Sequence, residues 1–324
     1  MALVFLFPGQ GAQSVHMMDG FQSSEIVHQT FAEAKAILGE DFWTLLQQEG
    51  NSRMDQTIVT QPLLLTVGVA VYRYFKSQIK NNTQLPDFLV GHSLGEYTAL
   101  VAAESIDFAE ALPLVQQRAL YMQEAVPKGE GAMAAILGLD AKTVETLCAE
   151  VAERENTILS PANYNTLEQI VVAGSKKAVE QAGLLAKGRG AKRVLPLSVS
   201  VPSHCLLMKG AAEKLAVSLS KVNIQSPKIP VIHNFDVQVH PEPDAIREAL
   251  IAQLYSPVRW SKSILHLLEL GVHHAVECSP SKVLCGLVRR VAKEIHCVSF
   301  TDRVNVDFFI PVSYTHLTLP TTPY

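Results

Sequence analysis

The sequence is poor in cysteine and lacks the cysteine spacing that commonly binds metals. Its five cysteines are an odd number and include no C-x-x-C pair, so we expect reduced thiols and no zinc site. An excess of basic charge is also missing, since the formal net charge is −4. This charge balance gives no reason to expect nucleic-acid binding, which relies on basic surfaces.

Long apolar runs and a targeting segment are absent as well. The best membrane candidate, residues 63–71, is soon followed by Arg73 and Lys76, and it is too short to span a bilayer. Residues 1–7 are apolar but lack a basic leader, so they are predicted to form a buried first strand and not a signal peptide. We therefore expect a cytoplasmic protein that does not bind membranes.

Composition and periodicity predict an α/β enzyme. The 324 residues are 48% hydrophobic and 18% charged, which is enough to bury a large core. Short apolar runs alternate with longer helix-like segments, a rhythm typical of a mainly parallel sheet. Strands are expected at 3–7, 87–90, 231–234 and 274–278, and helices at 26–38, 62–76, 96–103, 108–125, 208–221, 245–254, 263–270 and 282–293.

Residues 127–197 differ from the rest of the chain in the order of their expected strands and helices. Strands are expected at 132–139, 158–163, 169–174 and 191–197, and helices at 142–152 and 176–186. The order β-α-β-β-α-β is that of a ferredoxin-like unit. We predict a ferredoxin-like subdomain at 127–197, inserted in a larger domain of residues 1–126 and 198–309, with the active site in the cleft between them.

The C-terminal segment is unusual. Residues 311–324 contain no Asp, Glu, Lys or Arg and are dense in Thr and Pro. They have neither helical nor strand periodicity. The segment resembles translated foreign DNA more than a natural tail, so we expect residues 310–324 to be disordered, non-native and irrelevant to function.

The most informative motif is Gly91-His92-Ser93-Leu94-Gly95, which has the G-x-S-x-G form of a nucleophile elbow. It follows a predicted strand and precedes a predicted helix, and flanking glycines avoid the clashes that a sharp turn would impose on side chains. The helix would direct its free N–H groups at Ser93 and stabilise an oxyanion there. The alternative is a glycine-rich loop with an incidental serine.

A nucleophilic serine needs a base, and eleven histidines are present. His92 adjoins Ser93, but neighbours on an extended turn point apart, so it is a weak candidate. His204 lies on a proline-containing turn beside the predicted cleft; an ordinary surface-loop histidine is an equal interpretation. The adjacent pair His273 and His274 does not have chelating spacing, so no metal site is expected.

Four separated motifs resemble the malonyltransferase family, which includes malonyl-CoA:acyl carrier protein transacylases and polyketide-synthase acyltransferases. They are residues 7–13 (FPGQGAQ), 91–96 (GHSLGE), 201–204 (VPSH) and 253–260 (QLYSPVRW). The similarity covers about residues 1–300. It implies an α/β-hydrolase-like core with an inserted ferredoxin-like subdomain, in agreement with the periodicity. One departure is the segment 277–282, which stands where relatives commonly have a Gly-Pro-Gly turn and is expected to form a stiffer or differently shaped turn.

The resemblance also implies the roles of the catalytic residues. Ser93 would take the malonyl group, and His204 would be the base that activates it. The backbone carbonyl of Gln253 would hold the histidine in place of an aspartate. The backbone N–H groups of Gln10 and Leu94 would form the oxyanion hole.

Substrate selection would depend on Arg118, which lies in an otherwise apolar, uncharged segment. The family match implies that it binds the free carboxylate of malonate through a bidentate contact; a salt-bridged or snorkelling arginine is the alternative. Gln61, Asn163 and Asn165 match family positions near the pocket. Hydrogen bonding within core loops explains these three equally well.

The implied reaction is malonyl transfer from malonyl-CoA to acyl carrier protein through a malonyl-serine, with no cofactor. We expect a monomer. Alternatives are a polyketide or polyunsaturated-lipid acyltransferase acting in trans, a serine thioesterase or esterase, and a non-catalytic scaffold. Carrier proteins are acidic, so basic residues would steer docking, although each of two basic clusters is more simply a solvated helix end. The clusters are Lys187, Arg189, Lys192 and Arg193, and Arg289, Arg290 and Lys293.

Overall fold

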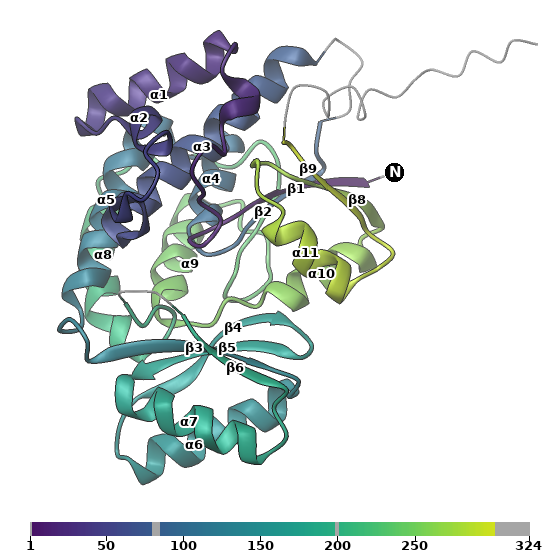
Figure 1. Cartoon of the computed structure of the whole chain (residues 1–324). Helices are drawn as coiled ribbons and strands as arrows, with labels where there is room; N and C mark the ends of the chain where they lie inside the picture. Colours follow the sequence, from purple (N-terminus) through teal and green to yellow (C-terminus); the bar gives the residue numbers. More distant parts are fainter. Residues whose placement is uncertain (1, 80–84, 198–200, 302–324) are drawn as a thin grey trace, which may run out of the picture.

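Two separate sheets organise the molecule (Figure 1). The structure is a computed structural model and describes residues 2–79, 85–197 and 201–301. One sheet is parallel and has five strands, and the other is antiparallel and has four. The predicted α/β class is therefore confirmed, while the prediction made for residues 310–324 lies outside the described residues.

The parallel sheet carries the functional turn. Its strand order is β7-β2-β1-β8-β9, and the strands are β1 (Ala2–Phe7), β2 (Phe88–Gly91), β7 (Val231–Ile232), β8 (Val272–Glu277) and β9 (His296–Ser299). The apolar run of β1 is almost wholly buried because helices cover both faces of the sheet. The edge strand β9 was not predicted, since it is short and begins with an exposed histidine.

Alternating side chains of β1 enter two different cores, as strand geometry requires. Phe5 and Phe7 belong to a large core with residues of several helices, whereas Val4 and Leu6 belong to a smaller core with residues of α10 and α11. The helices of this part are α1 (Glu25–Leu38), α2 (Phe42–Leu46), α3 (Thr57–Gln78), α4 (Gly95–Ala102), α5 (Phe108–Glu124), α8 (Lys209–Leu219), α9 (Pro243–Tyr255), α10 (Trp260–Glu269) and α11 (Val283–Val291).

Helix α3 is longer than predicted. It begins at Thr57 in place of Pro62, and Pro62 is its sixth residue, where proline supplies no N–H to the helical ladder. By length and hydropathy, its 22 residues meet the criteria for a membrane-spanning helix, but 89% of the most apolar window is buried inside the protein. The prediction that no apolar segment is long enough to span a bilayer is therefore wrong. Helix α3 is long enough, but it is buried as a core helix is.

The antiparallel sheet has the order β4-β5-β3-β6. It is built from β3 (Gly131–Leu137), β4 (Leu159–Thr166), β5 (Gln169–Ser175) and β6 (Arg193–Pro196), with α6 (Ala141–Arg154) and α7 (Lys176–Gly188) packed against it. These elements follow the β-α-β-β-α-β succession expected from the sequence. The domain boundaries at 126/127 and 197/198 stay a prediction.

Strand β4 connects the two parts of the molecule. The Tyr164 N–H donates to the Val258 carbonyl over 2.9 Å, and the Val258 N–H donates to the Ala162 carbonyl over 2.9 Å. Asn163 and Val258 thereby form a parallel bridge just before α10. This contact fixes one end of the antiparallel sheet beside the segment that follows α9.

The prediction of five reduced thiols is wrong for one pair. Cys285 of α11 and Cys297 of β9 form a disulfide, with their Cα atoms 5.2 Å apart. Cys148, Cys205 and Cys278 are free and buried. Because the pairing depends on how α11 packs against β9, the absence of a C-x-x-C motif could not reveal it.

Candidate active site

Ser93 lies on a sharp turn between β2, which ends at Gly91, and α4, which begins at Gly95. Its backbone φ is 53°, a left-handed conformation that is uncommon outside glycine. A Cβ atom added to Gly91 would lie 1.8 Å from the Gly95 carbonyl carbon, and one added to Gly95 would lie 1.9 Å from the Phe7 carbonyl oxygen. The predicted requirement for both glycines is confirmed, because no side chain fits at either position.

His204 connects Ser93 to Gln253. Ser93 Oγ lies 2.7 Å from His204 Nε2, and His204 Nδ1 lies 2.8 Å from the Gln253 backbone carbonyl oxygen. The His204 backbone also has a positive φ, of 61°, and its N–H donates to the Leu254 carbonyl over 3.0 Å. Ser93 on the serine turn and Gln253 on α9 therefore each contact one ring nitrogen of His204.

Electrostatics favours a neutral imidazole at this position. Burial and, to a lesser extent, the nearby Arg118 charge lower the pKa of His204 to about 3, although the bond to the Gln253 carbonyl opposes both effects. A carbonyl can only accept a hydrogen bond, so Nδ1 carries the proton and Nε2 is left as an acceptor. The Ser93 hydroxyl can thus donate to Nε2, which is the arrangement of a serine and its general base.

Arg118 of α5 lies buried beside this pair, with only 1% of its surface exposed. Its Nη1 donates to Gln61 Oε1 over 2.7 Å, and its Nη2 donates to Gln253 Oε1 over 2.9 Å and to Ser93 Oγ over 3.4 Å. Burial lowers its pKa. In the part of the chain that the structure describes, no carboxylate forms a salt bridge with this guanidinium.

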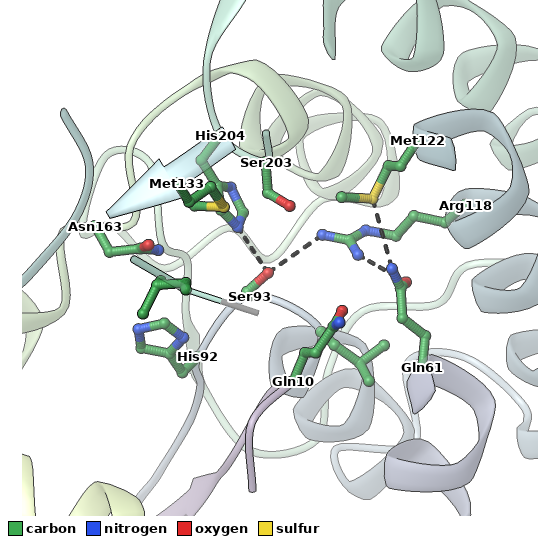
Figure 2. Close-up of a pocket in the computed structure, with 12 residues that line it drawn as sticks. Gln10, Gln61, His92, Ser93, Arg118, Met122, Met133, Asn163, Ser203 and His204 are labelled. Atoms are coloured by element: carbon green, nitrogen blue, oxygen red, sulfur yellow. Dashed lines mark hydrogen bonds between the residues drawn. The ribbon is translucent and has the colours of Figure 1, made fainter. Parts of the chain in front are cut away.

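These side chains open into one pocket, and Figure 2 shows the dashed contacts that join Ser93 to His204 and to Arg118. The antiparallel sheet contributes to its wall, because β3 and β4 supply Met133 and Asn163. The lining residues are Gln10, Gln61, His92, Ser93, Leu94, Arg118, Met122, Met133, Asn163, Leu197, Ser203 and His204. The sequence did not single out Met122, Met133, Leu197 or Ser203 as pocket residues.

Asn165 occupies a different position from the other predicted residues. It is not among the pocket-lining residues, and its Oδ1 lies 2.9 Å from His92 Nε2. His92 itself lines the pocket, and burial lowers its pKa. Because Asn165 engages its Nε2, His92 is oriented toward β4 and not toward the Ser93 hydroxyl, as expected for a residue adjoining the serine.

The Gln10 loop lies against the serine turn. A Cβ atom added to Gly9 would lie 2.4 Å from the His92 carbonyl oxygen and 3.5 Å from the Leu94 nitrogen. The Gln10 side chain donates to Thr57 Oγ1 over 3.2 Å. Within residues 2–79, 85–197 and 201–301, the backbone N–H groups of Gln10 and Leu94 form no hydrogen bond, so both donors remain available to a ligand.

Sequence reasoning missed the residues that support the serine turn. Asn234 Oδ1 accepts from the Ser93 N–H over 2.7 Å, and Asn234 Nδ2 donates to the Gly91 carbonyl over 2.6 Å. Glu96, fully buried in α4, contacts Asn234 as well. The signal available was Glu96 itself, a charged residue in the otherwise uncharged helix after the serine, where burial requires partners.

Two further predictions concern the basic clusters and a metal site. Arg189 pairs with Glu150, and Lys192 Nζ lies 3.0 Å from Glu168 Oε2, so part of the first basic cluster is neutralised. Among the described residues, no group of three or more His, Cys, Asp or Glu side chains is arranged to hold a metal ion.

Comparison with known proteins places this geometry in a family. A family model described as an acyl transferase domain matches residues 4–306. The malonyl CoA-acyl carrier protein transacylase of Escherichia coli (strain K12) is 52% identical over 288 residues, which cover 89% of this chain and 92% of that protein. The protein of the same name from Bacillus subtilis (strain 168) is 42% identical, covering 95% of this chain and 96% of its own length.

Solved structures agree with the sequence relatives. The malonyl CoA-acyl carrier protein transacylase of Coxiella burnetii superposes with a TM-score of 0.92 at 43% identity, covering 96% of this chain and 97% of that one. A malonyl-transacylase solved in complex with a type II polyketide-synthase acyl carrier protein also gives 0.92, at 44% identity and 96% and 99% coverage. The fold is thus shared with solved structures named as malonyl transacylases.

Proposed function

The chain belongs to the acyl transferase family, and we propose that it transfers the malonyl group of malonyl-CoA to the phosphopantetheine thiol of acyl carrier protein. The observation that carries this proposal is the contact of Ser93 Oγ with His204 Nε2 at 2.7 Å beside a buried Arg118. A nucleophile, a base and a carboxylate-binding cation then face one pocket.

The first half-reaction forms an ester on Ser93. Its Oγ attacks the thioester carbonyl carbon of malonyl-CoA while His204 Nε2 takes the hydroxyl proton. The tetrahedral intermediate collapses, the carbon–sulfur bond breaks, and the CoA sulfur leaves with the proton from His204. The backbone N–H groups of Gln10 and Leu94 stabilise the oxyanion, and one such donor is typically worth about 10²–10³ in rate.

The second half-reaction reverses these roles with another thiol. The phosphopantetheine thiol gives its proton to His204 Nε2, and the sulfur attacks the malonyl-serine carbonyl. The ester bond breaks, and Ser93 Oγ recovers the proton. The Gln253 carbonyl keeps Nδ1 protonated throughout and holds the imidazole without a full negative charge beside it.

Arg118 selects a substrate with a free carboxylate. Its guanidinium is buried among neutral hydrogen-bond partners, so the malonyl carboxylate supplies a compensating charge in a poorly solvated site. Gln61 holds Arg118 through Nη1, Asn163 lines the acyl pocket, and Asn165 acts indirectly by orienting His92.

The wider assignments follow from the same proposal. We expect a cytoplasmic monomer that needs no cofactor beyond its two substrates, divided into a core of residues 1–126 and 198–309 and a subdomain of residues 127–197. We propose fatty-acid synthesis as the pathway; the names of the relatives give malonyl-CoA and acyl carrier protein as the substrates. A polyketide role is the second candidate, because one similar structure is a malonyl-transacylase bound to a polyketide-synthase carrier protein.

Labelled malonyl-CoA, with and without carrier protein, tests the function. Wild-type protein should form a labelled Ser93 adduct that is discharged onto the carrier thiol, while Ser93→Ala should form none. A hydrolase would instead release free malonate at the same rate whether or not carrier protein is present. Absence of the wild-type adduct, or an undiminished adduct in Ser93→Ala, would contradict the proposal.

A further inference from the structure

Glu96 is a fully buried carboxylate next to the serine turn, and none of the chemical steps above uses it. His233 Nδ1 lies 2.8 Å from Glu96 Oε1, and the Asn234 N–H donates to Oε2 over 2.9 Å. Gln253 Nε2 donates to the same Oε2 over 3.0 Å. Two segments distant in sequence, the end of β7 and helix α9, therefore converge on this one side chain.

The Gln253 amide is the link between Glu96 and the reacting groups. Its Nε2 donates to Glu96 and also to the Ser93 carbonyl over 2.9 Å, and its Oε1 accepts from Arg118 Nη2 over 2.9 Å. Both amide N–H bonds and the oxygen are thus engaged. A flipped amide would place N–H groups against Arg118 and an oxygen against Glu96, so only one orientation satisfies the neighbours.

The Gln253 side-chain amide also lies between the Glu96 carboxylate and the Arg118 guanidinium, and it bonds both. The Glu96 charge raises the pKa of Arg118 and partly opposes the lowering caused by burial. A carboxylate in direct contact with the guanidinium would occupy the donors that bind substrate, whereas one separated by an amide stabilises the cation and leaves a substrate carboxylate room to bind.

We propose that Glu96 is a positioning residue that acts through the side-chain amide of Gln253, fixing both the Gln253 carbonyl that orients His204 and the guanidinium of Arg118. This inference rests on the proposed malonyl transfer. Glu96 forms no hydrogen bond with Ser93 Oγ or His204 among the described residues, and of its bonded partners Gln253 is the one that contacts both His204 and Arg118.

Glu96→Gln is the sharpest substitution because it preserves size. If the new NH₂ faces Gln253 and the Asn234 N–H, donors oppose donors. If it faces His233, Nδ1 must become an acceptor and the proton must move to Nε2, a buried atom without a partner among the described residues. The first arrangement displaces the Gln253 amide. The second leaves the new His233 Nε2–H unsatisfied and replaces the carboxylate that Gln253 faces with a weaker, neutral acceptor.

Glu277→Gln is the matched control. Glu277 is also fully buried at the end of a parallel strand, but its side chain accepts from Ser281 Oγ and from the Cys285 N–H, over 2.9 Å for the latter. Among the described residues its side chain forms no hydrogen bond with a residue that lines the Ser93 pocket. Single-turnover malonylation of Ser93 is expected to slow about 10- to 100-fold in Glu96→Gln and to stay within twofold of wild type in Glu277→Gln. Equal rates in the two variants would overturn the proposal.

A double-mutant cycle separates positioning from general loss of structure. In a Gln253→Ala background the backbone carbonyl remains but the amide is gone, so Glu96→Gln should cause no further slowing; an undiminished additional slowing would refute action through the amide. Should Glu96→Gln not fold, Gln253→Met must by itself reproduce the slowing, and an unchanged rate would refute the proposal.

A spectroscopic readout makes the inference independent of the proposed reaction. The His204 Nδ1 proton, assigned by its absence in His204→Ala, should change its low-field ¹H shift in Glu96→Gln and keep it in Glu277→Gln. An identical shift in all three folded proteins would contradict the network. If wild type forms no malonyl adduct, the proposed function fails, but this NMR measurement still decides the role of Glu96.

Discussion

The turn between β2 and α4 and the turn between β8 and α11 are structurally comparable but chemically different. Each follows a strand of the same parallel sheet, leads into a helix and contains a fully buried glutamate. Glu96 is bound by His233, Asn234 and Gln253 from other elements. Glu277 is bound within its own turn and helix, and burial raises its pKa.

This difference shows that a strand, a turn and a helix do not by themselves make an active site. In the first turn Ser93 has a positive φ, and two glycines allow neighbouring backbone to approach closely. No residue from Cys278 to Lys282, all of them described, has a positive φ. Distant elements converge on the first turn, whereas the side-chain bonds of Glu277 stay within the second turn and the start of α11.

The largest effect is expected from Gly95→Ala. The added Cβ would lie 1.9 Å from the Phe7 carbonyl oxygen, so either the serine turn or β1 must move. We expect loss of Ser93 malonylation and a marked loss of thermal stability. Gly286→Ala in α11 is the control, because nothing lies within 4 Å of its added Cβ; it should gain about 0.5–1 kcal/mol from helix propensity. Wild-type malonylation by Gly95→Ala would contradict the close-approach argument.

Arg118→Ala should alter specificity without removing the nucleophile. Loss of the paired, charge-assisted hydrogen bonds is expected to reduce malonyl transfer by about 10²-fold or more, while acetyl transfer is retained or increased. Rates with malonyl-CoA and acetyl-CoA measure the ratio, and Arg289→Ala on the exposed face of α11 should leave both rates unchanged. An equal loss with both substrates would show that Arg118 has no role in recognising the carboxylate.

The buried His204 imidazole, which contacts Ser93 of the first turn, makes the stability of the protein depend on pH. The folded-state pKa of His204 is about 3, below its ordinary value of 6.5, so the unfolded chain binds the additional proton between these pH values. His204 therefore favours the folded state fully above about pH 6.5, and this contribution declines as the pH falls toward 3, by at most ~1.4 kcal/mol per unit.

Replacement of His204 by Asn should accordingly reduce the loss of unfolding free energy between pH 7 and pH 5 by about 2 kcal/mol. Urea unfolding at the two pH values measures this difference. The same dependence in His204→Asn as in wild type would contradict a buried neutral imidazole.

Local patterns were sufficient to predict the serine turn and β1, β2, β7 and β8 of the parallel sheet, but not β9. The run from Leu3 to Phe7 is apolar throughout because the strand is buried on both faces. The spacing of Gly91 and Gly95 around Ser93 predicts the turn. The roles of Gln253 and Arg118 came only from resemblance to a family. Neither a backbone carbonyl acceptor nor a buried guanidinium has a sequence pattern of its own.

The features that were missed depend on contacts between distant residues. Glu96 lies 137 positions from His233 and 157 from Gln253, and neither partner is distinguishable beforehand from other histidines and glutamines. The family resemblance places both Asn163 and Asn165 near the pocket. Positions two apart normally share a strand face, but register irregularities in β4 disturb that alternation. The disulfide likewise depends on how α11 meets β9.

The smallest effect on activity is expected from Cys285→Ser. The disulfide to Cys297 ties α11 to the edge strand β9, and neither cysteine lines the Ser93 pocket. Its loss should lower the free energy of unfolding by about 2–4 kcal/mol, the usual range for a disulfide, while the rate of Ser93 malonylation stays that of wild type. Reduced wild-type protein should behave like Cys285→Ser. A large loss of malonylation in the stably folded variant would mean that the second turn is coupled to the first through β8 and β1, and that the two turns are not independent.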